Sequence, residues 1–170
     1  MKVVKLFCVG LFLLSTQLIF AQMTEEKLDE IVRKEAQEVE GQLGSWTMSY
    51  GDTPLVIISH AEANRMRIFA PVIEAKKMKP GEMEKMLEAN FHSALDAKYC
   101  LYEGMVITIY NHPLKELTDE QLVDAMRQVV VLAATYGTTY SSTDMIFGGG
   151  FQEKEKPKVN ESPTKTGFKN

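Results

Sequence analysis

The sequence predicts a single α+β domain, an antiparallel five-stranded sheet with helices in the order α-β-β-β-α-β-β-α. Three observations support this prediction. Apolar residues recur at helical spacing in three segments, which begin near Thr24, Pro80 and Thr118. Between these segments, short runs alternate or cluster apolar residues as strands do. The connections between neighbouring runs are short, which favours antiparallel pairing of consecutive strands.

The first 21 residues are predicted to be a signal peptide. Lys2 and Lys5 give a basic start, residues 6–20 are mainly apolar, and the small residue Ala21 precedes Gln22 at a plausible cleavage site. The apolar run is short for a membrane span, and an acidic segment follows it. We therefore expect a bacterial protein that is periplasmic or secreted, with no stable membrane insertion after cleavage. An uncleaved N-terminal anchor is the alternative.

Removal of 21 residues from 170 leaves 149, enough for one domain with a core. Two of the 19 basic residues leave with the signal, so 17 remain against 23 acidic residues, which argues against nucleic acid as a partner. Only Cys100 remains of the cysteines, so no disulfide can form within the mature chain. We predict three parts: a signal peptide at 1–21, a single domain at 22–140 and a disordered polar tail at 141–170.

The first helix is predicted to begin after Thr24 and to run to about Leu43. Thr24 can cap this helix, and acidic residues stand in its first turn, where the helix dipole favours negative charge. Gly41 and Gly44 mark its predicted end. Its apolar stripe consists of Leu28, Ile31, Val32, Ala36, Val39 and Leu43.

Three strands are predicted next. Residues 45–50 alternate polar and apolar side chains, as a half-buried strand does. Residues 55–60 are densely apolar, which predicts a central strand covered on both faces. Residues 65–70 alternate again, with Arg65 and Arg67 on one side.

A second helix is predicted after the basic connector that ends at Pro80. Methionines 78, 83 and 86 in this region could form an adaptable binding surface or simply fill the core. The face that this helix should bury carries Met83, Met86, Leu87, Asn90, Phe91 and Leu95.

The last two strands form a predicted hairpin over residues 99–110, with Glu103-Gly104 as its turn. This register pairs Tyr102 with Met105. Both faces of the hairpin are apolar or aromatic, whereas a hairpin open to water on one side would alternate cleanly. Something must therefore cover the second face, at least in part.

The last helix is predicted to begin at Thr118, which forms a capping box with Gln121. Its apolar stripe is so wide that the helix must be buried centrally or shared with a partner. Hairpin and helix together offer more apolar surface than one small domain readily covers, so we predict an interface there. The candidate interface residues are Tyr99, Leu101, Val106, Thr108, Tyr110, Val131 and Leu132.

The sequence predicts no active site. His60, His92 and His112 lack the spacing of metal ligands, and no nucleophile or phosphate-loop motif occurs. We therefore expect no metal, no cofactor and no catalysis. The only cluster that could serve an enzyme consists of His60, Arg65 and Arg67.

Two short motifs support a family resemblance. Asn90-Phe91 precedes the hairpin, and Leu114-Lys115-Glu116-Leu117-Thr118 leads into the last helix. With the order of elements, these motifs resemble the type III secretion chaperone-like fold, which includes the Tir chaperone (CesT) and YbjN-like families. The resemblance covers about residues 24–136 and implies a non-enzymatic α+β domain, often dimeric, that binds an extended segment of another protein. Such chaperones work in the cytosol, whereas the predicted signal peptide would export this chain.

These observations predict a non-enzymatic, exported, chaperone-like module that forms a homodimer and binds an extended segment of a partner protein. The alternative is a periplasmic carrier of a small apolar ligand, such as a lipid, held between the sheet and the helices.

Overall fold

The structure is a computed structural model that describes residues 22–143 and 145. The predicted signal peptide and the tail from residue 146 onward lie outside the described residues. Three α-helices and a short 3-10 helix are described: α2 (Glu25–Glu35), α3 (Glu82–His92), α4 (Asp119–Ala134) and η1 (Ala75–Lys77). None of these helices combines the length and the apolar character needed to cross a membrane.

Six strands form one sheet in which every neighbouring pair is antiparallel, in the order β1-β2-β3-β4-β6-β5. The strands are β1 (Gln37–Gln42), β2 (Ser45–Tyr50), β3 (Thr53–His60), β4 (Arg65–Glu74), β5 (Lys98–Tyr102) and β6 (Met105–His112).

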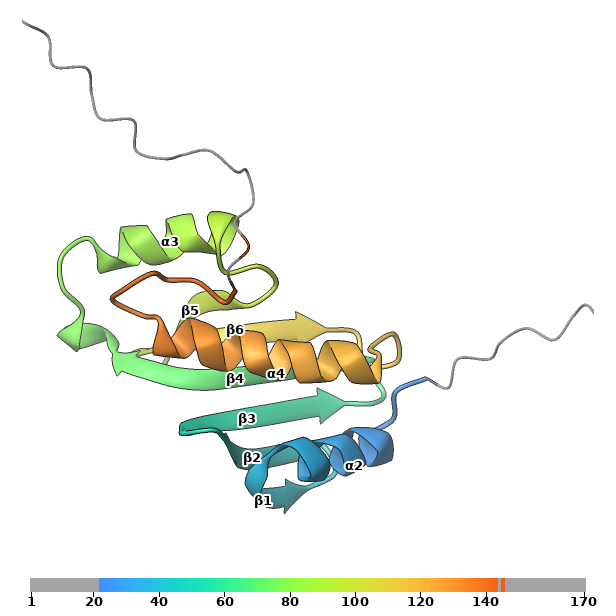
Figure 1. Ribbon diagram of the computed structural model, residues 1–170. Coiled ribbons are helices and arrows are strands. Elements are labelled where there is room, and N and C mark those ends of the chain that lie inside the picture. The colour runs from blue at the N-terminus through green and yellow to red at the C-terminus, as the bar shows by residue number, and fades with distance from the viewer. Residues whose placement is uncertain (1–21, 144, 146–170) are drawn as a thin grey trace, which may run out of the picture.

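Helices α2 and α4 lie over one face of this sheet, and α3 lies along its β5 edge (Figure 1). Helix α4 crosses β3, β4 and β6, α2 lies beside β1 and α3 lies beside β5. Trp46 and Ile68 of the sheet are fully buried beneath the helices. Leu28 of α2 and Met126 of α4, which face the sheet, are fully buried as well. These side chains belong to a single hydrophobic core. The described residues place no helix on the opposite face of the sheet.

The sheet has six strands, one more than predicted, because residues 37–42 form an edge strand and not the end of the first helix. Helix α2 ends at Glu35, and Ala36 after it is extended. Gln42 pairs with Ser45 across a tight turn into β2. Gly41 is essential there, because its φ is +111° and a Cβ on it would lie 2.2 Å from the Ser45 carbonyl oxygen. The helical spacing of the stripe beyond Glu35 is therefore a coincidence.

The hairpin prediction is confirmed. Tyr102 pairs with Met105 and Cys100 with Ile107. Glu103 and Gly104 both have positive φ, as a two-residue turn with φ above zero at both positions requires.

The helix start at Thr118 is also confirmed. The Thr118 side chain accepts from the Gln121 N–H, and the Gln121 side chain accepts from the Thr118 N–H.

The prediction that residues 55–60 are covered on both faces is wrong for one face. Leu55 and Ile57 are fully buried under the helices, but Ile58 on the other face is 44% exposed. The physical reason is the one-sided placement of the helices, which leaves this strand with a single covered face.

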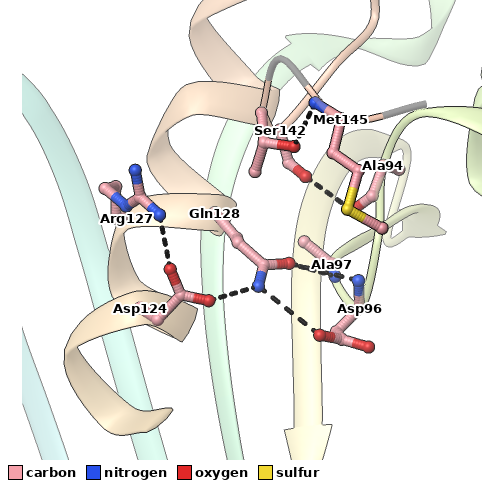
Figure 2. A network of polar contacts seen from close by, with 9 residues as sticks. Ala94, Asp96, Ala97, Asp124, Arg127, Gln128, Ser142 and Met145 are labelled. Atoms are coloured by element: carbon pink, nitrogen blue, oxygen red, sulfur yellow. Dashed lines mark hydrogen bonds and ion pairs between the residues drawn. The ribbon is translucent and has the colours of Figure 1, made fainter. Parts of the chain in front are cut away.

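A buried amide ties α4 to the loop before β5 (Figure 2). Gln128 of α4 is only 3% exposed. Its Oε1 accepts from the backbone N–H groups of Asp96 and Ala97, at 3.1 and 3.3 Å. Its Nε2 donates to Asp124 Oδ2 at 2.7 Å. Hydrogen bonds from Arg127 and Gln128 lower the pKa of Asp124, so the acceptor is a carboxylate near neutral pH.

Residues 141–143, which the sequence assigns to the polar tail, are bound to the domain. The Ser142 N–H donates to the Ser93 carbonyl at 3.1 Å, and the Ser142 hydroxyl donates to the Ala94 carbonyl at 2.9 Å. Ser142 is buried. The segment after α4 therefore runs back to the end of α3 (Figure 1).

Replacing Gly41 with alanine should lower the free energy of unfolding by about 1–3 kcal/mol, because the new Cβ meets the Ser45 carbonyl at a strained φ. In a helix the same change would raise it by about 1 kcal/mol. Denaturant unfolding followed by circular dichroism measures the difference. Gly51→Ala is the matched control, since Gly51 has a φ of +59° but no atom within 4 Å of its Cβ. An equal loss in both variants would contradict the close contact at Gly41.

Replacing Gln128 with alanine should lower the free energy of unfolding by about 2–3 kcal/mol, because two buried N–H groups lose their acceptor. Hydrogen exchange at the Asp96 and Ala97 amides should quicken in this variant. Arg127→Ala is the control, since Arg127 contacts the same Asp124 from the exposed side and should change both readouts far less. Unchanged exchange in Gln128→Ala would refute the role of the amide.

Candidate protein-binding surface

The structure buries most of the predicted interface inside the monomer. Five of the seven candidate residues belong to the core or its polar contacts with α4: Tyr99, Val106, Thr108, Tyr110 and Leu132. The Tyr99 hydroxyl donates to the Leu132 carbonyl at 2.7 Å, and the Thr108 hydroxyl donates to the Val129 carbonyl at 2.9 Å. Val131 is half-buried, and Leu101 alone is well exposed. Helix α4 thus covers the hairpin face that we assigned to a partner.

Exposed apolar residues gather instead on α3 and the neighbouring strand. Met83, Leu87 and Phe91 follow one another at intervals of four residues, so they line one face of α3. Leu87 is 65% exposed, Phe91 76% and Leu101 of β5 49%. We call Met83, Leu87, Phe91 and Leu101 the α3–β5 surface. Scattered exposed apolar residues are ordinary, but a contiguous group marks an interaction site.

The exposure of this face has a simple cause. The apolar arc of α3 is wide, and the sequence assigns all of it to the core. Helix α3 lies at the rim of the sheet, where β5 is the strand that it contacts. Only the side with Met86 and Ala89 is buried there. The remaining half of the arc faces solvent, and the sequence pattern alone did not distinguish the two halves.

A shallow hollow of about 230 Å³ lies within this surface. The residues that line it are Met83, Met86, Leu87, Tyr99, Cys100 and Leu101. Methionine adapts its shape readily, so such a wall suits apolar side chains of varied form. Drug-sized ligands usually occupy about 300–1,000 Å³, so the hollow fits a side chain better than a lipid.

Strand β5 also offers backbone groups at the edge of the sheet. The outward-facing backbone groups of Tyr99 are already bonded to Asn90 of α3. The Asn90 Oδ1 accepts from the Tyr99 N–H at 2.7 Å, and its Nδ2 donates to the Tyr99 carbonyl at 3.2 Å. Backbone groups of alternate residues point the same way along a strand, so those of Leu101 also face outward. Within the described residues, the Leu101 carbonyl accepts only a long contact of 3.7 Å from the Cys100 thiol.

The two edges of the sheet differ in chemistry. The other edge strand, β1, is polar at nearly every position and is irregular between Gln37 and Glu40. Charged side chains and bulges are the usual protection of an edge against pairing with another chain. Strand β5 is regular, and its exposed end, Cys100 to Tyr102, carries no charged side chain.

Polar contacts hold α3 in place against the rest of the domain. The Lys98 ammonium donates to the carbonyls of Asn90, at 2.7 Å, and of Leu95. Burial lowers the pKa of Lys98. At the other end of the helix, the Tyr136 hydroxyl donates to Glu82 Oε2 at 2.5 Å, which lowers the pKa of Glu82. The α3–β5 surface is therefore supported from both ends of the helix.

The described residues contain no group of three or more histidine, cysteine or acidic side chains that could hold a metal ion. His60, Arg65 and Arg67, the cluster that could serve an enzyme, do come together on the open face of the sheet. Cys100 is exposed on β5 and forms no disulfide.

Comparison with known proteins gives a consistent result for the fold. No family model and no curated protein sequence matches the chain. Among solved structures, the HopA1–SchA chaperone–effector complex contains a chain that matches with a TM-score of 0.50 and 16% identity, over 64% of this chain and 88% of that chain. The ExsC–ExsE complex matches with a TM-score of 0.50 and 14% identity, over 65% and 91%.

A third match is the Yersinia pestis type III secretion chaperone SycH in complex with a fragment of YscM2, with a TM-score of 0.50 and 15% identity, over 66% and 99%. At this level of identity the likeness concerns the fold. The matched region is nearly the whole of each neighbouring chain, so the chain has the type III secretion chaperone-like fold that its sequence resembles.

Proposed function

We propose that this protein is a non-enzymatic, chaperone-like module whose α3–β5 surface holds an extended segment of another protein. The observation that carries the proposal is the exposed stripe of Leu87 and Phe91 beside the part of the β5 edge that Asn90 leaves free. The solved structures of the same fold are of complexes with partner proteins, which supports a protein-binding role.

An added strand explains how such a segment would bind. Its backbone would pair with the outward N–H and carbonyl of Leu101, beyond the position that Asn90 occupies. Alternate side chains of the segment would then lie against Met83 and Leu87 in the hollow. Main-chain pairing supplies affinity in this mode, and the hollow selects apolar side chains.

We also propose that the chain forms a homodimer through the same α3–β5 surface. A second copy would bury Phe91 and Leu87, which water otherwise surrounds. Partner segment and second copy would compete for one surface, and their concentrations would decide which is bound.

Replacing Leu87 with glutamate should abolish both associations, because a charge enters the apolar surface. Light scattering after size exclusion, at tens of micromolar protein, should give a dimer for the wild type and a monomer for the variant. With a partner recovered from the host envelope, the wild type should protect the Leu101 amide from hydrogen exchange on binding, and the variant should not.

Leu43→Glu is the matched control, since Leu43 is equally apolar and 47% exposed, but lies in the β1–β2 turn. It should dimerise and bind as the wild type does. Circular dichroism confirms that both variants are folded. A wild type that is monomeric at tens of micromolar would refute the dimer. Partner binding that survives Leu87→Glu, or that leaves the Leu101 amide unprotected, would refute the binding surface.

We further propose that the protein acts in the periplasm or outside the cell, which rests on the basic start and apolar run of residues 1–21. Mass spectrometry of the protein from its own host should find Gln22 at the N-terminus, in the envelope or the medium. Intact chains that begin at Met1 in the cytosol would refute export.

A further inference from the structure

We infer that the open face of the sheet carries a binding site for a carboxylate group, built from Arg65, Arg67 and Asn111 beside Ile58. This inference rests on the proposed function in one respect, since the carboxylate is taken to belong to an extended segment of a partner protein. None of these residues belongs to the α3–β5 surface, so the site is a second point of contact.

The register of the strands brings these residues together on one face. Arg65 and Arg67 lie two residues apart on β4, so both side chains project from the same face. Arg67 is opposite Ile58 of β3 and also opposite Asn111 of β6, while His60 is opposite Arg65. This is the face that carries no helix in the described chain.

An open hollow of about 360 Å³ lies among these residues. Its lining residues are Ile58, Ser59, His60, Arg65, Met66, Arg67 and Asn111. Ile58 is 44% exposed and gives the hollow an apolar side next to its basic one.

Both arginines are held by neutral groups. Arg67 Nε donates to Asn111 Oδ1 at 2.7 Å, and Arg65 Nη1 donates to the Asn64 carbonyl at 2.7 Å. These contacts orient each guanidinium but leave its charge uncompensated. In the part of the chain that the structure describes, no ion pair joins either arginine to a carboxylate.

The other two arginines of the chain are paired. Arg33 Nε lies 3.0 Å from Asp29 Oδ1, and Arg127 Nη2 lies 2.6 Å from Asp124 Oδ1. The chain has a net charge of −4, so acidic groups are abundant. Two oriented, uncompensated guanidinium groups side by side in an acidic protein indicate a ligand that brings its own carboxylate, which a guanidinium binds through two parallel hydrogen bonds.

The surroundings favour a protein segment as the source of this carboxylate. Phosphate sites commonly use backbone N–H groups at a helix N-terminus, whereas the donors here are side chains on an open sheet. The apolar surface continues from Ile58 to the half-buried pair Val56 and Phe69 on the same face. An extended acidic segment could place a carboxylate on the arginines and a nearby apolar side chain on Ile58 or Phe69.

The test uses the purified full chain labelled with ¹⁵N and two short synthetic peptides. One alternates glutamate and valine, and the other has glutamine in place of each glutamate. The four arginine Nε–H signals report directly on the site. The acidic peptide should shift the signals of Arg65 and Arg67, leave those of Arg33 and Arg127, and bind at least about fivefold more tightly than the glutamine peptide.

Arg67→Gln should remove most of this difference. Arg127→Gln makes the same change of charge at an arginine that already has a partner, and it should leave the difference intact. Equal affinity for the two peptides, equal shifts at all four arginines, or equal effects of both variants would overturn the site.

Free glutamate and inorganic phosphate, added separately, identify the source of the anion. Saturation by either at the concentration that suffices for the peptide would overturn the assignment to a protein segment. Leu87→Glu should bind the acidic peptide as the wild type does, because Leu87 lies outside this face. Failure of this site is thereby separated from failure of the α3–β5 surface.

Discussion

Burial of one face of the sheet beneath α2 and α4 is the constraint on which the other features depend. Leu55, Ile57 and Ile68 belong to the core beneath the helices, and Trp46 is buried beside α2. Removing such apolar surface from water is the main favourable contribution to folding. Because no described helix lies on the opposite face, that face stays open. Helix α3 lies at the rim, so only one side of it is covered. Both candidate binding regions follow from this geometry.

Local sequence signals predicted much of the fold. The capping box at Thr118 and the turn at Glu103-Gly104 depend on residues only a few positions apart, so a short window suffices to identify them. The missing strand β1 shows where such windows fail. Val39 continues a helical stripe, but the close approach of Gly41 to the Ser45 carbonyl exists only after the chain has turned. A tertiary contact overrode the local pattern.

The candidate site shows the same division. Apolar spacing correctly placed Met86 in the core, but it also placed Phe91 there, because periodicity shows how wide an apolar arc is and not how much of it a sheet covers. For the hairpin the error was the opposite one, because residues predicted to be available to a partner are buried within the domain. Thr108 and Tyr110 looked like surplus surface, yet α4 covers them, and even the Thr108 hydroxyl finds a carbonyl of that helix. Coverage depends on where elements sit, which no single segment specifies.

The two surfaces differ in the kind of selectivity that they could provide. The α3–β5 surface is apolar and methionine-lined, and such surfaces accept varied shapes. Each arginine on the open face is oriented by a hydrogen bond to a neutral group and keeps its charge, so the pair would discriminate between an acidic segment and a neutral one. A protein that used both surfaces could bind segments of varied sequence and still reject segments without a carboxylate.

The Asn90 amide also sets the register in which a partner strand can pair with β5. It makes the two hydrogen bonds to the Tyr99 backbone that a neighbouring strand would otherwise make. The amide thus takes the place of one residue of a paired strand. An incoming strand must therefore begin its pairing beyond Tyr99, at Leu101, and this fixes its register. A slip of one residue would turn every apolar side chain of the incoming segment away from the hollow. The same amide shortens the free edge, so less backbone is available for edge-to-edge pairing between copies of the chain.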